Sequence, residues 1–265
     1  MRTPIPKVLT IAGSDSGGCA GIQADLKTFA AFKTHGMSVL TAITAQNTRG
    51  VTAIQYVSPA LIEAQIRAVM SDIGAAAVKS GMLPNPPAMR VVAACLREYG
   101  LLRYVLDPVM VATSGARLMN SGAESALVRH LFPLALIVTP NRCEAEILSG
   151  RGIRTPRQMK DAARAIHDLG PAYVLIKGGH FRGDASDLLF DGHGFEAYST
   201  PRYPTANLHG SGCTLAAAIT ACLAQGMDTR DAVAEAKRYV NEAIKHSYAV
   251  GKGPGPLGHF FRWWA

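Results

Sequence analysis

The stretch with the clearest chemical potential joins a glycine-rich loop to an apolar helix. It comprises residues 209–214, HGSGCT, and continues into the small apolar sequence of residues 215–219. A loop that opens a helix in this way leaves backbone N–H groups unpaired, with the positive end of the helix dipole behind them. The glycines also let the backbone approach a ligand closely. We therefore expect Gly210, Ser211 and Gly212 to form an anion-binding loop.

A cysteine lies in the first turn of that predicted helix. At this position the field of the helix lowers the pKa of a thiol from about 8.5 towards neutrality, so Cys213 is a candidate base. An anion-binding loop that contains a base is suited to phosphoryl transfer. The alternative is a structural helix start in which Cys213 is only a small buried side chain, and this stretch alone does not decide between them.

Composition indicates one globular domain that spans residues 1–265. The chain is 48% hydrophobic and carries a net charge of +8, and no linker, repeat or low-complexity segment divides it. Its basic residues are scattered singly. A positive field that attracts nucleotides or phosphorylated substrates therefore explains the charge better than nucleic-acid binding does.

Cysteine usage indicates a reducing environment. The five cysteines are an odd number at irregular spacings and include no C-x-x-C pair, so neither a disulfide framework nor a zinc site is expected. The first residues have no apolar signal core, and no apolar run is long enough to span a membrane. We expect a cytoplasmic protein that does not associate with membranes.

Strand and helix patterns alternate almost throughout the chain, which predicts an α/β fold with a mostly parallel sheet, helices on both faces and three layers. A hairpin is expected around Asp191-Gly192. Ser58-Pro59 should start one helix, and capping boxes at Ser121–Glu124 and Thr155–Gln158 should start two more. The expected strands before the hairpin are residues 8–12, 38–45, 51–57, 76–82, 104–110, 136–141 and 173–180.

Polar or glycine residues recur where these strands end. In a parallel sheet the carboxyl ends of the strands share one edge, so such residues can converge on a single cleft. Each one taken alone is equally consistent with a solvated loop. The residues concerned are Gly13, Gln46, Lys79, Asp107, Asn141 and Lys177.

Several short motifs occur together in a characteristic order. Through them the chain resembles the hydroxymethylpyrimidine/phosphomethylpyrimidine kinases of thiamine biosynthesis, a branch of the ribokinase-like superfamily, over nearly its whole length. The motifs are IAGSDS (11–16), GIQADLKT (21–28), QNT (46–48), KSGML (79–83), LDPVM (106–110), TPN (139–141), KGGH (177–180), HGSGCT (209–214) and the tail 253–264.

This resemblance implies a ribokinase-like fold, ATP with Mg²⁺, and a homodimer. It implies two successive phosphorylations, which convert 4-amino-5-hydroxymethyl-2-methylpyrimidine to its diphosphate. Cys213 would be the base that acts on the substrate hydroxymethyl group. Most sugar kinases of the superfamily have an aspartate at that position, so the thiol favours the vitamin-kinase branch.

The resemblance also implies roles for individual residues. Asn141 would contact the nucleotide, and Glu144 of the N-x-x-E motif would organise Mg²⁺. Asp107 would help to hold metal or phosphate, and Lys177, together with Gly210 and Gly212, would bind the transferring phosphoryl group. The implied substrate contacts are Gly13, Asp25, Gln46, Met82 and Val109.

Two departures from the family pattern are relevant. Many members carry glutamate where this chain has Gln46, although an amide can both donate to a ring nitrogen and accept from an exocyclic amine. Cys19 and Gly17 replace a usual glycine and a usual serine, which leaves the backbone path of the first loop open.

Three other functions remain open at this stage. They are a pyridoxal kinase of the same branch, a hydrolase with Cys213 as its nucleophile, and a non-catalytic sensor of nucleotide or vitamin.

Overall fold

A computed structural model describes residues 4–110, 122–178 and 184–264 of the chain. Its described strands form one nine-stranded sheet in the order β3-β2-β1-β4-β5-β6-β7-β8-β9. The six strands from β2 to β7 in this order are parallel, whereas β3, β8 and β9 pair antiparallel. The strands are β1 (Lys7–Asp15), β2 (His35–Asn47), β3 (Gly50–Tyr56), β4 (Ala77–Ser80), β5 (Tyr104–Leu106), β6 (Ile137–Val138), β7 (Tyr173–Ile176), β8 (Ala185–Phe190) and β9 (Phe195–Thr200).

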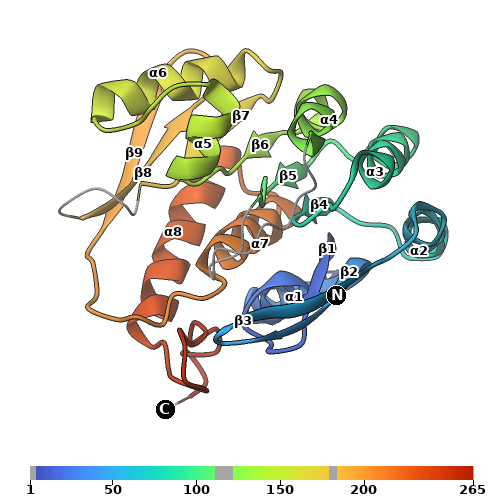
Figure 1. The fold of residues 1–265 in the computed structure, drawn as a ribbon, viewed down its shortest axis with the longest axis horizontal. Helices are drawn as coiled ribbons and strands as arrows, with labels where there is room; N and C mark the ends of the chain where they lie inside the picture. Colours follow the sequence, from blue (N-terminus) through green and yellow to red (C-terminus); the bar gives the residue numbers. More distant parts are fainter. Residues whose placement is uncertain (1–3, 111–121, 179–183, 265) are drawn as a thin grey trace.

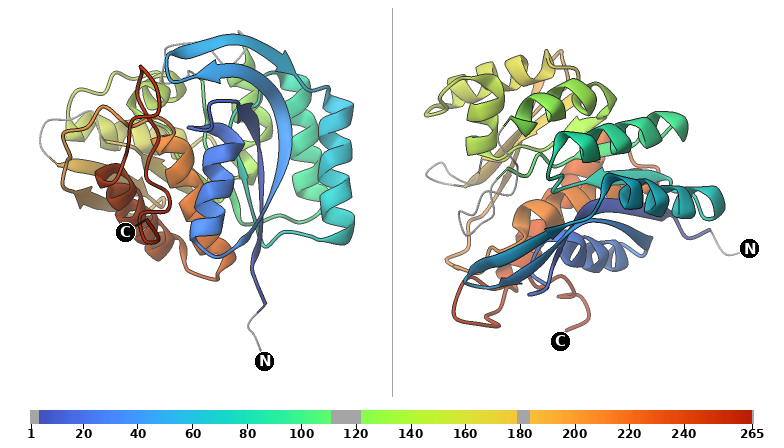
Figure 2. Two further views of the ribbon diagram at one scale, coloured as in Figure 1. Left: turned by 90° about the horizontal axis from the view of Figure 1, so that it is seen from below. Right: turned by 45° about the vertical axis from the view of Figure 1, so that its right-hand side comes forward.

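Helices cover both faces of this sheet, so the predicted three-layer α/β architecture is confirmed (Figures 1 and 2). One apolar cluster joins the sheet to α2 (Pro59–Asp72), α3 (Pro86–Glu98), α4 (Ala123–His130), α5 (Arg142–Ser149) and α6 (Pro156–His167). A second cluster joins the opposite face to α1 (Gly21–Ala31), α7 (Ser211–Ala224) and α8 (Thr229–Lys245). A short 3₁₀ helix, η1 (Phe132–Leu134), follows α4.

Helix α7 is buried along almost its whole length. Every residue from Thr214 to Leu223 is buried, and the helix packs against α1, α8 and the sheet. Its small side chains allow this close packing, because alanine fills a narrow layer without steric conflict. The start of α7 is therefore held rigidly at one edge of the sheet.

Local sequence signals explain most helix starts. The Ser58 hydroxyl accepts a hydrogen bond from the Leu61 N–H, as expected for a cap followed by proline. The capping box at Thr155 and Gln158 is confirmed. Helix α4 instead begins after Gly122, which has a φ of 78° and no side-chain cap, and Ser121 lies outside the described residues.

A fully buried ion pair ties α1 to the sheet. The Lys79 ammonium on β4 lies 2.8 Å from both carboxylate oxygens of Asp25 on α1, and Thr10 on β1 donates to Asp25 over 2.6 Å. Both charged side chains are 0% exposed. Burial disfavours the Lys79 ammonium, but the surrounding negative groups, Asp25 foremost, together outweigh this effect and raise the pKa of Lys79. Each of the two buried charges is therefore stabilised by the other, and removing one leaves the other without a partner.

We predict that Lys79→Met destabilises the protein by about 3–5 kcal/mol, because it leaves the Asp25 carboxylate buried without its partner. Urea unfolding followed by circular dichroism measures this loss. The matched control is the double variant Asp25→Asn/Lys79→Met, which removes both charges and should recover most of the stability. A loss below about 1 kcal/mol for the single variant would contradict the interdependence of the pair.

Candidate active site

Charged side chains converge at the carboxyl ends of the parallel strands. Lys177, directly after β7, places its Nζ 3.1 Å from Oδ1 of Asp107, directly after β5. Thr139, which follows β6, donates to the same oxygen over 3.3 Å. The Asp107 side chain is only 2% exposed and that of Lys177 16%. Burial disfavours the Lys177 ammonium, but Asp107 and Glu144 outweigh this effect and raise its pKa, so the lysine stays charged.

The start of α7 lies against this pair. A Cβ atom built on Gly212 would be 3.2 Å from Lys177 Nζ and 4.0 Å from Asp107 Oδ2. The backbone of the predicted anion-binding loop is therefore in contact with the cation that follows β7. We expected the sheet edge and the glycine-rich loop to lie together, and this is confirmed for Asp107, Lys177 and Gly212.

The loop itself differs from the prediction at one residue. Gly210 has a φ of 83°, and its Cα packs so closely on the Cys19 carbonyl that a side chain would not fit. The Ser211 N–H donates to the Leu208 carbonyl over 3.2 Å, so this amide is not free to bind an anion, contrary to expectation. Among the described residues, the N–H groups of Gly210, Gly212 and Cys213 have no hydrogen-bond partner. These three amides are the ones that remain available to a ligand.

Cys213 is partly exposed at this loop, but the expected lowering of its pKa is wrong. Burial raises the pKa of Cys213 to about 11. The Lys79 ammonium and a hydrogen bond from the Gly21 backbone lower it, whereas the Asp25 and Asp107 carboxylates raise it further. Desolvation of the thiolate therefore exceeds the help that the surrounding cations and amides provide.

The N-x-x-E motif forms a capping box at the start of α5. The Asn141 N–H donates to Glu144 Oε2 over 2.7 Å, and the Glu144 N–H donates to Asn141 Oδ1 over 3.0 Å. The prediction assigned both side chains to ligands and missed this box, although its spacing is a standard helix-start signal. Burial raises the pKa of Glu144 to about 7, Lys177 opposes the shift and Asp107 adds to it.

The side chains of Asp107 and Glu144 fit a magnesium ion that is also bound by a nucleotide. Within the described ranges, no group of three or more His, Cys, Asp or Glu side chains is arranged to hold a metal alone. Asp107 and Glu144 are both buried, and the Asp107 carboxylate is near enough to raise the pKa of Glu144. Mg²⁺ is usually held by one or two carboxylates, water and substrate phosphates, so a pair of carboxylates is a suitable donor set.

A small apolar patch adjoins the charged cluster. Met82 packs with Ala42, Ile54 and Val109, and a Cβ built on Gly13 would be 3.0 Å from the Met82 sulfur. Three of the predicted substrate contacts, Gly13, Met82 and Val109, thus belong to one patch. Flat apolar surfaces of this kind suit an aromatic ring.

Asp25 does not face this patch. Its carboxylate is fully buried and bound by Lys79 and Thr10, so the expectation that it contacts substrate is corrected. Helix α1 turns this side chain towards the sheet, beneath the site. Lys79, expected at the edge of the cleft, is likewise fully buried.

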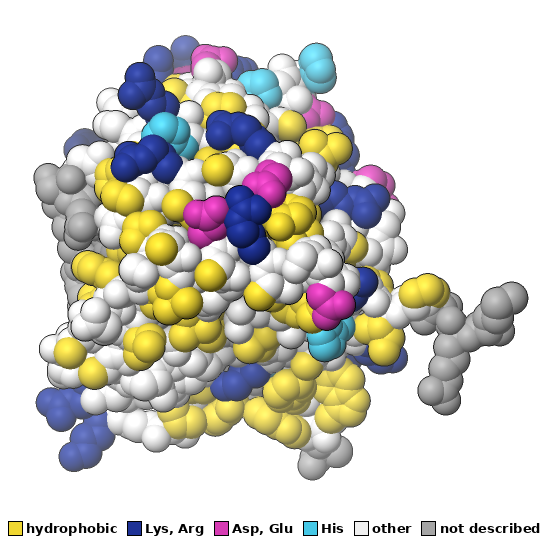
Figure 3. Space-filling model, turned by 90° about the vertical axis from the view of Figure 1, so that its right-hand side faces the viewer, with side chains coloured by type: hydrophobic (Ala, Val, Ile, Leu, Met, Phe, Trp, Pro, Cys, Tyr) yellow, Lys and Arg dark blue, Asp and Glu magenta, His cyan; other side chains and the backbone are white. Residues whose placement is uncertain are grey.

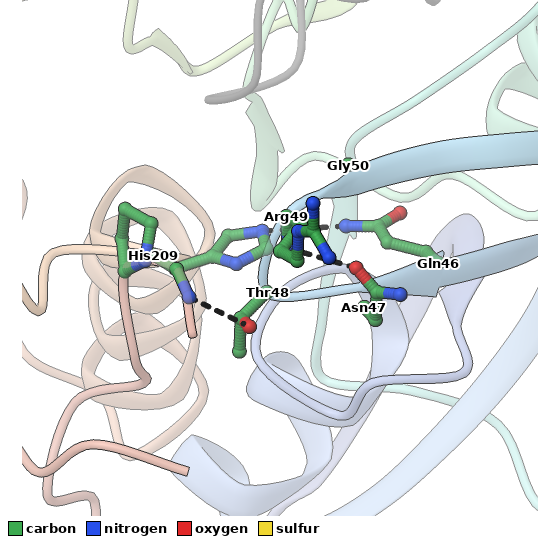
Figure 4. Close-up of a pocket in the computed structure, with 8 residues that line it drawn as sticks. Gln46, Asn47, Thr48, Arg49, Gly50 and His209 are labelled. Atoms are coloured by element: carbon green, nitrogen blue, oxygen red, sulfur yellow. Dashed lines mark hydrogen bonds between the residues drawn. The ribbon is translucent and has the colours of Figure 1, made fainter. Parts of the chain in front are cut away.

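A cavity of about 310 Å³ opens beside the loop (Figure 4). It is lined by residues 46–50, His209, Gly253 and Pro254. Gln46 Nε2 lies 3.3 Å from His209 Nε2, and since an amide nitrogen only donates, the His209 ring nitrogen must accept. Burial lowers the pKa of His209, which favours this neutral form. The prediction missed His209 as a site residue, although it directly precedes the Gly-Ser-Gly loop.

The first loop tolerates its unusual residues. The Asp15 carboxylate accepts hydrogen bonds from the N–H groups of Gly17, Cys19 and Ala20 over 2.8–2.9 Å. Positive φ values fall on Gly18 and Gly21, while Cys19 has none and buries its side chain. The substitution of cysteine for glycine therefore causes no backbone strain. Gly179 and His180 of the predicted KGGH motif lie outside the described residues.

Comparisons with known proteins agree with this geometry. Residues 15–258 match the family described as phosphomethylpyrimidine kinase. The chain is 49% identical over 259 residues to the hydroxymethylpyrimidine/phosphomethylpyrimidine kinase of Synechococcus elongatus, with 97% of this chain and 98% of that protein covered. It is 52% identical over 261 residues to the thiamine biosynthesis bifunctional protein ThiED of Geobacter sulfurreducens. That match includes 97% of this chain but only 53% of the longer protein.

A solved structure supports the same grouping. The ADP complex of Bacillus subtilis pyridoxal kinase superposes with a TM-score of 0.92 at 38% identity, over 99% of this chain and 100% of that one. The fold is therefore that of the ribokinase-like vitamin kinases, as predicted. By the match to the family model and the identity to full-length relatives, the chain belongs to the phosphomethylpyrimidine kinase family.

Proposed function

We propose that this protein is an ATP-dependent kinase that phosphorylates hydroxymethylpyrimidine and then converts the monophosphate to the diphosphate, in thiamine biosynthesis. The observation that carries the proposal is the set of unpaired amides at the start of α7, in contact with the Lys177–Asp107 pair. Amides and a cation at one point stabilise negative charge on a transferring phosphoryl group. The names of the relatives supply the substrate class.

The two substrates would bind in neighbouring parts of the site. The pyrimidine ring would lie on the patch of Gly13, Met82 and Val109, with Gln46 at its edge. Its hydroxymethyl group would then point towards Cys213. The ATP phosphates would lie along the amides of Gly210 and Gly212. Much of the rate enhancement would come from this alignment of the reactants.

Nucleotide and metal would meet at the ends of β5 and β6. The ADP complex of the pyridoxal kinase relative supports a nucleotide site in this fold. Asp107 and Glu144 would hold Mg²⁺, and Asn141 at the same helix start would lie beside the nucleotide. When bound, the ion supplies positive charge that screens the phosphates.

Cys213 would accept the proton of the substrate alcohol in the first step. This role needs the thiolate, and the cations Lys79 and Lys177 are the groups that favour it. In the second step the nucleophile is a phosphate monoester with a second pKa of about 6, which is already ionised at neutral pH. The second step therefore needs no base.

A pyridoxal kinase is the second candidate, because the structure of such an enzyme superposes over the whole chain. Identity favours the first candidate, at 49% to the pyrimidine kinase relative against 38% to the pyridoxal kinase. Coupled assays of ADP release on hydroxymethylpyrimidine and on pyridoxal, with the mono- and diphosphate products resolved by chromatography, separate the two. Faster turnover of pyridoxal would reverse the assignment.

The active form would be a homodimer in the cytoplasm. Hydrophobic side chains are exposed on and beside the edge strands, at Ile43, Tyr56 and Leu61. On the side of the molecule that carries α2 and α3, most charges gather in the upper half and hydrophobic side chains are prominent in the lower half (Figure 3). A light-scattering mass equal to one chain would contradict the dimer.

All five cysteines are free, as expected in a reducing compartment. No helix in the described part of the chain is long and apolar enough to cross a membrane.

We predict that Cys213→Ala slows the first phosphorylation by roughly 10²–10⁴-fold and leaves the second nearly unchanged, because only the first step requires a general base. Single-turnover assays that start from hydroxymethylpyrimidine or from its monophosphate measure the two steps separately. In the unaltered enzyme, the first step should also accelerate as pH rises from 7 to 9, because the thiolate fraction grows towards the raised pKa of Cys213.

Cys143→Ala is the matched control, since it removes an exposed thiol on α5. This variant should keep both rates. An equal loss in both steps of Cys213→Ala would show that the residue shapes the anion-binding loop and does not transfer a proton.

A further inference from the structure

The C-terminal tail, defined here as residues 251–261, borders the cavity that contains Gln46 and His209. Figure 1 shows it beside the β2–β3 hairpin and the start of α7. Gly253 and Pro254 line the same cavity as His209 and the turn of residues 46–50 (Figure 4). The tail thus forms one wall of a cavity whose other walls come from segments more than 150 residues apart in the sequence.

The tail contacts the turn through the backbone of two glycines and through Thr48. The Gly253 N–H donates to the Thr48 hydroxyl over 3.1 Å. A Cβ built on Gly253 would be 2.0 Å from the Thr48 carbonyl oxygen, and one on Gly251 would be 2.5 Å from its hydroxyl oxygen. No side chain fits at either glycine. A larger residue at Gly253 must push the tail and the turn apart.

The tail also holds the segment that enters the anion-binding loop. The His209 N–H donates to the Gly255 carbonyl over 3.2 Å, and the Gly255 N–H donates to Asn207 Oδ1 over 2.8 Å. Further along, His259 Nε2 lies 3.0 Å from the Thr214 hydroxyl in the first turn of α7. Both sides of the cavity therefore bond to the same short stretch of chain.

Helix α8 anchors this stretch. The Gly258 N–H donates to the Ala243 carbonyl over 2.9 Å, and the Tyr239 hydroxyl donates to the His259 carbonyl over 2.8 Å. Tyr239 is itself buried among the side chains between α8 and the sheet. The tail is thus fixed to α8, and the turn of residues 46–50 packs against it.

The turn needs such support because it ends an edge hairpin. Residues 46–50 join β2 to β3, the outermost strand of the sheet. Exposed turns of this kind open easily unless other contacts restrain them. Gln46, whose Nε2 lies 3.3 Å from His209 Nε2, is at the base of this turn, so a shift of the turn would change that contact.

We propose that the tail is a positioning element of the pyrimidine site, in which Gly253 holds the turn and Gly255 holds His209, so that Gln46 and His209 face each other. The inference rests on the proposed kinase function. The contact of Gly253 with Thr48 should act mainly on the pyrimidine, because it lies on the turn beside Gln46, whereas Asn141 and Lys177 lie at strands β6 and β7, at the other end of the parallel region.

Steady-state kinetics of Gly253→Ala test this inference. We expect the KM for hydroxymethylpyrimidine to rise by about tenfold or more, because a displacement of about 1 Å at a binding group is costly, while the KM for ATP changes less than about twofold. The matched control is Gly194→Ala, where a Cβ meets no atom within 4 Å. Both of its KM values should equal those of the unaltered enzyme.

Thr48→Val provides a milder second variant, which keeps the shape of the side chain and removes the acceptor of the Gly253 N–H. It should raise the same KM by about threefold or more without unfolding the protein. Equal rises in both KM values, or a smaller rise in the KM for the pyrimidine, would overturn the inference. If the unaltered protein phosphorylates no pyrimidine at all, the proposed function itself is wrong. If the unaltered protein is a pyrimidine kinase but its variants have the same KM for pyrimidine, only the role of the tail is wrong.

Discussion

The buried ion pair of Asp25 and Lys79 is the interaction on which the rest of the site depends. It joins α1 to the central strands β1 and β4, directly beneath the start of α7. Gly21, one helical turn before Asp25, donates its backbone N–H to the sulfur of Cys213. The position of the thiol therefore follows from the position of α1. Removing both charges from water is costly unless they stay together, so the pair specifies one placement of this helix.

In the proposed function, two parts of the sheet edge would have different roles: one would bind the phosphates and the other the pyrimidine ring. The ends of β5, β6 and β7 carry a charged cluster in which Asp107 and Lys177 neutralise each other and Glu144 is held by its own helix cap. The ends of β1, β2 and β4 carry the apolar patch and the cavity. The loop of Gly210–Cys213 lies between the two halves. Charge is thus concentrated where phosphate must be stabilised and kept away from the ring.

This separation explains how one fold serves more than one vitamin kinase. The pyridoxal kinase of Bacillus subtilis superposes over the full chain, so the backbone frame for phosphoryl transfer is shared. Differences in substrate then reside in the few side chains that meet the ring. In the proposed function they would include Gln46, whose amide lies against a neutral His209. A neutral pair suits a neutral heterocycle, because no charge has to be desolvated on binding.

The sequence by itself determined the fold class, the order of the elements and the glycine-rich start of α7. These features depend on local signals: apolar strands that end in polar residues, caps such as Ser58 and Thr155, and glycines before an apolar helix. The spacing of Asn141 and Glu144 also predicts a capping box, although the prediction assigned these residues only to ligands. Only the tertiary structure decided that Asp25 is buried, that the pKa of Cys213 is raised, and that His209 and the tail complete the cavity. Burial and desolvation depend on which distant segments pack together, and no local pattern encodes that.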